Sequence, residues 1–167
     1  MKVISNAGPL IHLTQAGILN LLFKLFEEVI IPESVYKEVV IVGKREGYPD
    51  AIIIENAITE DKIRVYREPI KKINLVLENL HKGEKEVIEL AIQLQENLVL
   101  LDDEEARIVA KKYNLKVKGT LGILIDSIKK GLIDKNSAIK YLKKINDIMY
   151  LSSDLYALVE EVIVNIQ

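Results

Sequence analysis

The sequence predicts an α/β fold in which helices cover both faces of a central, mainly parallel sheet of four to five strands. Short β-branched runs alternate along the chain with segments whose apolar residues recur every three or four positions, which is typical of parallel sheets. Residues 98–101 are apolar throughout, as expected of a strand buried on both faces. With 167 residues, the chain has the length of one domain, which we expect over residues 1–167.

The elements of the first half are bounded by glycine and proline. Residues 2–5 form a β-branched run that stops at Asn6-Ala7-Gly8-Pro9. Pro9 suits the first turn of a helix at 9–15, where the N–H that it lacks would have no partner. After a second short helix that reaches residue 25, the expected elements are a strand at 28–31 closed by Pro32, a helix at 33–42, a loop at 43–50, a helix at about 50–58, a strand at 63–66 and a helix at 70–80.

The second half contains the strongest helical pattern. Gly83 begins a helix whose inward face carries Val87, Ile88, Ala91 and Leu94. It is followed by a strand at 98–101, a helix at 104–113, a strand at 115–118 and helices at 120–130, 135–148 and 153–164, the last two in a C-terminal helical extension at 134–167. Ligands of parallel sheets bind beyond the carboxyl ends of the strands, so we expect the site just after residues 5, 31, 101 and 118.

The composition excludes several kinds of catalytic centre. The chain has no cysteine, so a disulfide framework, a thiol nucleophile and a cysteine zinc site are excluded. With only two histidines, a multi-histidine metal centre and a Ser-His-Asp triad are nearly excluded as well. We expect His12 to be a half-buried packing residue and His81 a solvated loop residue, and neither to act as a general base.

Charge and hydropathy bear on partners and location. The chain has 23 basic and 25 acidic residues, a formal net charge of −2, so nucleic-acid binding requires a local basic face. No uncharged apolar run reaches about 18 residues, and the N-terminus has no signal-peptide pattern. We therefore expect a cytoplasmic protein with no membrane partner. Frequent Lys, Glu and Ile without Cys resemble the composition of thermophile proteins.

Oxygen-bearing side chains follow strands that we expect to be neighbours in the sheet. Asn6 follows the first strand and Asp102 the fourth, while Glu84 opens the helix before the fourth strand and Glu38 lies in the helix after the second. Clustered carboxylates are typical of sites for hard divalent cations, Mg²⁺ or Mn²⁺. Two such ions about 4 Å apart activate a water and stabilise the leaving oxygen of a phosphodiester.

Each of these residues also has a purely structural interpretation. Asp102 or Asp103 fits the N-cap of the following helix, a role that stabilises by about 1 kcal/mol. An acid such as Glu84 is favoured in a first helical turn by the helix dipole. Glu38 alone resembles a solvated surface acid, and Asn6 alone a turn residue. Only the set as a whole indicates a site.

Five stretches of the sequence carry a family pattern. They are Val3-Ile4-Ser5-Asn6-Ala7-Gly8-Pro9-Leu10-Ile11, Ile31-Pro32-Glu33-Ser34-Val35-Tyr36-Lys37-Glu38-Val39, Leu80-His81-Lys82-Gly83-Glu84, Leu100-Leu101-Asp102-Asp103-Glu104-Glu105-Ala106-Arg107 and Lys118-Gly119-Thr120-Leu121-Gly122-Ile123-Leu124. In this order they resemble prokaryotic PIN domains, the metal-dependent nuclease fold of many VapC-type toxins. The likeness extends over roughly residues 3–160 and implies a PIN-like three-layer α/β/α fold.

The resemblance also implies roles for the polar residues. It places the family's first acid at Asn6, its helical glutamate at Glu38, its third acid at Glu84 and its fourth at Asp102, with Asp103 as the fallback metal ligand. Family members use these acids to bind Mg²⁺ or Mn²⁺ and to hydrolyse RNA phosphodiesters by metal-activated water. A VapC-like toxin would in addition have an antitoxin protein as its partner.

The chain departs from the family pattern at Asn6. An amide offers a carbonyl oxygen but no charge, so we expect weaker metal binding, slower chemistry or none. Two functions therefore stay open: a metal-dependent ribonuclease of the VapC-like toxin type, and a catalytically impaired PIN-fold module that binds RNA or a protein. A doubly wound nucleotide binder is disfavoured, because the chain has no glycine-rich phosphate-binding motif.

Three further residues are expected to contact nucleic acid. Arg107 is placed either to clamp a phosphate or to pair with a carboxylate, and Thr120 either to donate its hydroxyl in the crevice or to cap its helix. Lys118 belongs to a basic patch, although solvated helix faces are the commoner explanation for lysine runs. The last two helices carry many apolar residues, and an excess of them would suggest a homodimer or a partner segment.

Overall fold

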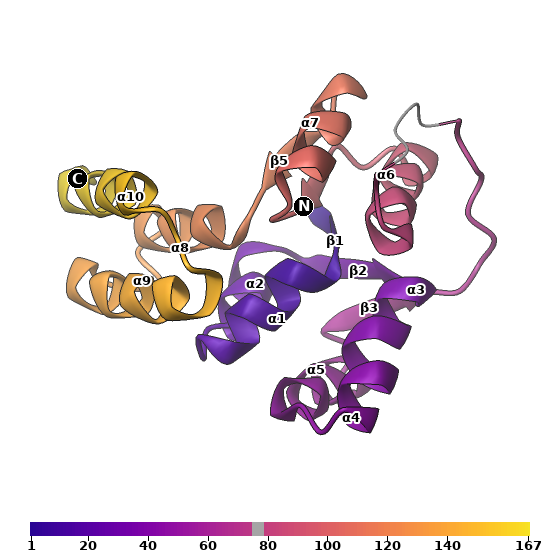
Figure 1. Ribbon diagram of the computed structural model, residues 1–167, viewed down its shortest axis with the longest axis horizontal. Coiled ribbons are helices and arrows are strands. Elements are labelled where there is room, and N and C mark those ends of the chain that lie inside the picture. The colour runs from indigo at the N-terminus through magenta and orange to yellow at the C-terminus, as the bar shows by residue number, and fades with distance from the viewer. Residues whose placement is uncertain (75–78) are drawn as a thin grey trace.

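The computed structural model describes residues 1–74 and 79–167. Five parallel strands form a sheet in the order β3-β2-β1-β4-β5 (Figure 1). The strands are β1 (Lys2–Ser5), β2 (Glu28–Pro32), β3 (Ile63–Tyr66), β4 (Leu98–Leu100) and β5 (Lys116–Lys118). The prediction of an α/β fold with a parallel sheet is confirmed, and β1 and β4 are neighbours, with Ile4 opposite Val99 and Ser5 opposite Leu100.

Helices cover both faces of the sheet, as Figure 1 shows. One face packs against α6 (Lys82–Leu94) and α7 (Glu104–Lys112). The other packs against α2 (Asn20–Leu25), α5 (Pro49–Thr59) and α8 (Thr120–Lys129), and α1 (Ala7–Gln15) packs against α5 and α8. The strands between these layers are accordingly apolar, and Val3, Ile4, Ile30 and Val99 are fully buried. Each such side chain contributes about 1.5–3 kcal/mol by leaving water.

The chain between β2 and α5 is helical almost throughout. It consists of α3 (Glu33–Tyr36), the π-helix η1 (Lys37–Val42) and α4 (Gly43–Arg45). The predicted helix at 33–42 is therefore present but changes from α to π geometry after Tyr36. The predicted loop at 43–50 is wrong: α4 continues the helix, and only residues 46–48 separate it from α5. Packing explains the difference, because Gly43 lies against Ala51 and the Lys44 ammonium pairs with Glu55, 2.9 Å away.

The predicted helix at 70–80 is also wrong where it can be tested. Residues 70–74 are not helical, and residues 75–78 lie outside the described part of the chain. The N–H groups of Lys71 and Ile73 donate to the side chains of Gln93 and Glu89 on α6, at 2.7 and 3.0 Å. Side-chain acceptors on α6 therefore satisfy backbone groups that a helix would have satisfied internally.

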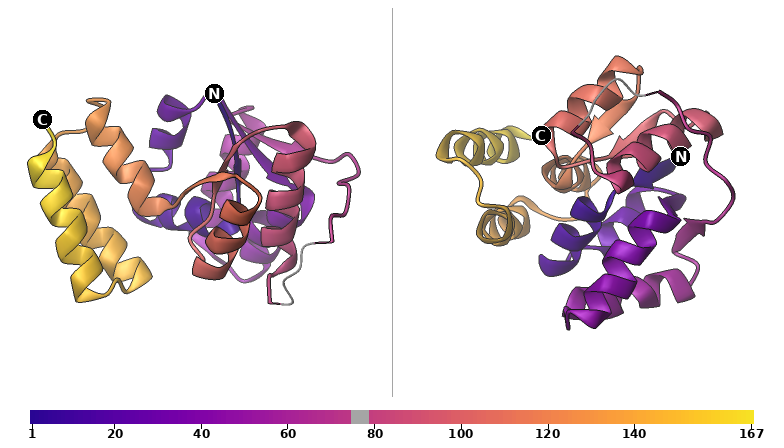
Figure 2. Two further views of the ribbon diagram at one scale, coloured as in Figure 1. Left: turned by 90° about the horizontal axis from the view of Figure 1, so that it is seen from above. Right: turned by 45° about the vertical axis from the view of Figure 1, so that its right-hand side comes forward.

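The last two helices form a hairpin beyond α8, which Figure 2 shows from above. They are α9 (Lys135–Met149) and α10 (Ser153–Asn165), which pack against each other, while α9 also contacts α8 and α1. Asp134 and Ser152 cap them by accepting hydrogen bonds from the N–H groups of Ser137 and Leu155. None of the described helices is long and apolar enough to cross a membrane.

Candidate active site

The carboxyl ends of β1 and β4 bring Asn6 and Asp102 to the same edge of the sheet. The N–H of Asn6 donates to the carbonyl of Leu100, 3.0 Å away, and the N–H of Leu101 donates to the carbonyl of Lys118, 2.9 Å away. These bonds extend the ladder just past the strands, so the residues that follow leave the sheet side by side. The structure therefore has polar side chains at the edge where the sequence places the site.

Three donors hold the Asp102 carboxylate. The Thr120 N–H donates to Oδ1 at 2.7 Å, the Thr120 hydroxyl donates to Oδ2 at 2.6 Å, and the His12 Nδ1 lies 2.7 Å from Oδ2. Burial is the strongest single influence on this group and raises its pKa. The hydrogen bonds from His12 and Thr120 together outweigh burial, so the pKa of Asp102 lies below its usual value. Asp102 is thus an ionised and oriented carboxylate.

His12 is a member of the site that the sequence did not reveal. We expected a packing residue, but its ring reaches back along α1 to Asp102, and 26% of the side chain stays exposed. Helical side chains point toward the N-terminus of their helix, which brings the ring toward Gly8, one turn earlier. A Cβ on Gly8 would lie 3.7 Å from Asp102 Oδ2 and 3.8 Å from His12 Cε1, so Gly8 lies directly beside this pair.

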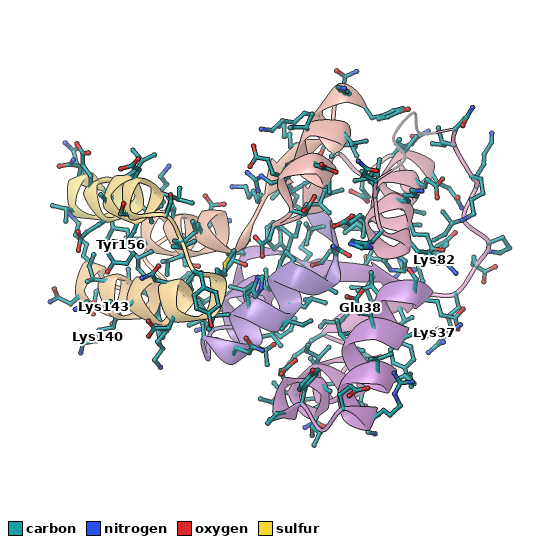
Figure 3. The ribbon with its side chains drawn as sticks, in the orientation of Figure 1. Lys37, Glu38, Lys82, Lys140, Lys143 and Tyr156 are labelled. Carbon is teal, nitrogen blue, oxygen red and sulfur yellow. The ribbon has the colours of Figure 1, made fainter. Side chains whose placement is uncertain are left out.

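Asn6 and Glu38 converge on the first turn of α6. A Cβ on Gly83 would lie 3.1 Å from Asn6 Oδ1 and 3.7 Å from Glu38 Oε2, so both oxygens face the same glycine. Figure 3 shows Glu38 on the side of its helix that faces α6. The Asn6 Oδ1 atom is buried and has no hydrogen-bond partner in the described part of the chain. A buried acceptor without a donor costs free energy, which a bound cation would recover.

Glu84 is nearly buried beside these groups, with 6% of its surface exposed. Its Oε2 accepts the N–H of His81, 2.9 Å away, so His81 is exposed as expected but also forms the N-cap of α6. Burial raises the pKa of Glu84 most, the His81 hydrogen bond opposes this, and the negative charges of Asp103 and Glu38 raise it further. Glu84 therefore lies within electrostatic reach of two other carboxylates.

The structure resolves which aspartate caps α7. The Oδ1 of Asp103 accepts the N–H of Ala106 at 2.9 Å, so Asp103, and not Asp102, is the N-cap of α7. Of the two roles considered for Arg107, pairing with a carboxylate is not seen in residues 1–74 and 79–167, where its Nη1 donates to the carbonyl of Leu101 at 2.9 Å. Of the two roles considered for Thr120, the structure shows the hydroxyl donated in the crevice, to Asp102, whereas the N-cap of α8 is Gly119. Lys118 pairs with Asp126.

The crevice thus has two sides. We call Asp102, His12 and Thr120 the Asp102 side, and Asn6, Glu38 and Glu84 the Glu84 side. Within residues 1–74 and 79–167, no group of three histidine, aspartate or glutamate side chains is arranged to hold a metal ion. The oxygen donors nevertheless fit a hard cation on the Glu84 side, because the unpartnered Asn6 Oδ1 and two mutually repelling carboxylates meet there.

Comparison with known proteins places the chain in a family. No curated protein and no solved structure matches it. A family model described as a PIN domain matches residues 2–163, nearly the whole chain. PIN domains have a nuclease-type fold, generally use divalent metals and generally bind nucleic acid. The parallel five-stranded sheet agrees with this fold. The chain belongs to the PIN-domain family.

Proposed function

We propose that this protein is a Mg²⁺- or Mn²⁺-dependent ribonuclease of the VapC-like toxin type. The observation that carries the proposal is the convergence of Asn6 and Glu38 on the first turn of α6, next to Glu84. Asp102 adds a third carboxylate, which is ionised, at the same edge of the sheet. In a PIN domain, such oxygens at the carboxyl ends of β1 and β4 support the hydrolysis of phosphodiesters.

The proposed mechanism assigns a task to each residue. Glu38 and Glu84 would hold the cation with Asn6 Oδ1, and Asp102 would complete the site, with Asp103 as the fallback ligand. A cation held by these residues would supply the activated water that phosphodiester hydrolysis needs. His12 and Thr120 fix the orientation of Asp102. The guanidinium N–H groups of Arg107 that do not donate to Leu101 would contact a phosphate. Lys118 and the side chain of Thr120 are the other two residues that we expect to contact RNA.

Cleavage of RNA by the purified protein tests this proposal. We expect single-stranded oligonucleotides to be cut in Mn²⁺ and to stay intact in EDTA. Glu38→Gln removes one charged donor and should slow cleavage by about 100-fold, or about 2.7 kcal/mol of barrier. Glu161→Gln makes the same chemical change on exposed α10 and should leave the rate unchanged. Cleavage that survives Glu38→Gln and Asp102→Ala alike would show a contaminant and remove the enzyme assignment.

A partner is proposed from the groove beside Asp102. This cavity of about 360 Å³ runs from Asp102 and Arg107 to Leu155 and Val159 on α10. Its polar end and apolar end suit a peptide segment, which supports an antitoxin protein as partner. Leu158 and Val164 are exposed on the same helix and support the homodimer that we expect. Light scattering tests the homodimer. If the dimer forms through α10, the wild type should have the mass of a dimer and Leu158→Lys, which places a charge on that surface, the mass of a monomer.

The second candidate function is a PIN-fold module that binds RNA or a protein without cleaving it. Two observations favour it: Asn6 stands in place of an acid, and both oxygens of Asp102 already accept hydrogen bonds from the protein. Under this alternative, RNA binds but stays intact at every Mn²⁺ concentration. Binding and cleavage assays on the same oligonucleotide therefore separate the two functions.

A further inference from the structure

A cluster of basic side chains borders the Glu84 side of the crevice. It consists of Lys37, Arg67, Lys72, Lys82 and Lys85, which we call the basic rim. Lys37 directly precedes Glu38, and Lys82 lies two residues before Glu84. Figure 3 shows both lysines to the right of Glu38, Lys82 above and Lys37 below; Lys37 begins η1 and Lys82 begins α6. The basic rim is therefore adjacent to the acidic residues of the Glu84 side.

The rim has more positive than negative charge. Glu33 lies 3.9 Å from the Lys37 ammonium and 3.2 Å from the Arg67 guanidinium, and Glu86 lies 3.9 and 3.8 Å from the ammonium groups of Lys72 and Lys82. Two carboxylates thus serve four cations. The three lysine separations exceed hydrogen-bonding distance, so these ammonium groups keep their donors for another ligand.

The rim is also accessible. The side chains of Lys37 and Lys82 are 63% and 75% exposed. Three rim residues also line a cavity of about 410 Å³. They are Lys72, Lys82 and Lys85, and the rest of the lining is Ile73, Asn74 and Glu89. A row of accessible ammonium groups beside an open cavity is a surface that attracts polyanions even on a chain with a net charge of −2.

Several other lysines, among them Lys118, are placed less well. Lys118 pairs with Asp126, the Lys135 ammonium donates to the carbonyl of Val164 at 2.8 Å, and Lys144 lies over the ring of Tyr141. Lys140 and Lys143 are on α9, at the far end of the molecule from Glu38 (Figure 3). The rim is thus the basic surface that adjoins the Glu84 side.

We infer that the basic rim binds the phosphate backbone of single-stranded RNA and leads it into the crevice. This inference rests on the proposed function, because it takes the polyanion to be the substrate of the acidic site. Phosphates carry one charge per nucleotide at a regular spacing, which suits separate basic side chains on η1, on α6 and on the segment between them. When the rim lysines neutralise phosphate charges, they offset the electrostatic repulsion between the phosphates and the carboxylates of Glu38 and Glu84.

Binding measured without metal tests the inference separately from cleavage. The fluorescence anisotropy of a labelled single-stranded RNA is followed in EDTA over a series of salt concentrations. For the double variant Lys37→Ala/Lys82→Ala, we expect about tenfold weaker binding. Its logarithmic salt slope should be shallower by about 1.4, the value for two lost contacts on a single strand. Lys140→Ala/Lys143→Ala removes the same charge from α9 and should leave both quantities unchanged.

Three outcomes would overturn the inference. Equal weakening by both double variants would mean that only net charge matters. Unchanged binding in Lys37→Ala/Lys82→Ala would mean that RNA takes another route. Poly-glutamate that competes with RNA as effectively as a single-stranded nucleic acid would mean that the rim serves an acidic peptide. Because no divalent metal is present, none of these results depends on whether the protein cleaves RNA.

Discussion

The two sides of the crevice differ in how fully their oxygens are partnered. On the Asp102 side, Thr120 and His12 supply three donors to one carboxylate, whose pKa is lowered. On the Glu84 side, Asn6 Oδ1 has no partner in the described residues and the pKa of Glu84 is raised. Protein donors thus satisfy the oxygens of the Asp102 side, whereas those of the Glu84 side lack a positive partner. A cation is therefore expected to act mainly on the Glu84 side.

The largest effect is expected where the Asp102 side is packed most tightly. A Cβ on Gly119 would lie 2.6 Å from Asp102 Oδ1 and 2.9 Å from Arg107 Nη1. Gly119→Ala should therefore lower the free energy of unfolding by about 3 kcal/mol, because overpacking forces neighbouring groups to move. Gly122→Ala is the matched control, since its nearest contact would be 3.5 Å away, at Lys118 Cβ. It should stabilise α8 by about 0.5–1 kcal/mol. Urea unfolding measures both, and equal effects would contradict the packing described for Asp102.

Removal of the histidine donor should have the next largest effect. His12→Ala leaves Asp102 with two donors, both from Thr120, and should destabilise the fold by about 1–2 kcal/mol, as for a partly exposed hydrogen bond to a charged group. His12→Asn keeps an N–H at a similar position and should recover part of this loss. If the two variants unfold at the same urea concentration, the hydrogen bond to Asp102 contributes nothing and His12 is the packing residue expected from the sequence.

A smaller effect, of about 1 kcal/mol, is expected from restoring an acid on the Glu84 side. Asn6→Asp adds a negative charge beside Glu38 and Glu84, so it should lower the melting temperature in EDTA. The same variant should show a larger rise in melting temperature with Mn²⁺ than the wild type, because the cation gains a charged ligand. Asn56→Asp, on exposed α5, controls for net charge. An identical Mn²⁺ response in wild type and Asn6→Asp would place the cation elsewhere.

The smallest effects are opposite pH dependences of the two sides. The folded-state pKa of Glu84 is raised above 4.5, so the folded protein binds this proton more tightly and stability falls as pH rises from 4.5 through the raised pKa. The pKa of Asp102 is lowered below 3.8, so its contribution is present above 3.8 and is lost as pH falls through the lowered pKa. Glu84→Gln should abolish the first change and Asp102→Asn the second. Urea unfolding from about pH 3 to 7 measures them, and unaltered pH profiles would show that neither group titrates as described.

The sequence predicted the sheet, and the edge at which Asn6 and Asp102 lie together, because both depend on local patterns. Short apolar runs mark the strands, and Asn6 and Asp102 directly follow two of them. The position of Asp102 next to Asn6 then follows from the parallel topology. The roles proposed for Glu38 and Glu84 as metal ligands stay predictions, although the structure brings Glu38 close to Gly83.

The partners of these residues could not be predicted in the same way. His12 occurs in a helix with apolar neighbours, and its hydrogen bond spans 90 positions of sequence, so no local pattern shows it. The ends of α4 and α5 depend on Gly43 packing against Ala51, a tertiary contact that overrides the loop-like composition. Residues 70–74 are held by acceptors on α6 that helical periodicity does not report.

The π-helix η1 has a consequence for tolerance to insertions and deletions. A π-turn holds one more residue than an α-turn, so η1 absorbs an extra residue between Glu38, which faces the crevice, and Gly43, which faces α5. Loss of one residue from this turn would restore α geometry and rotate one end against the other by about 100°. A change of length at η1 would therefore alter the direction in which Glu38 points relative to the packing of α4 and α5.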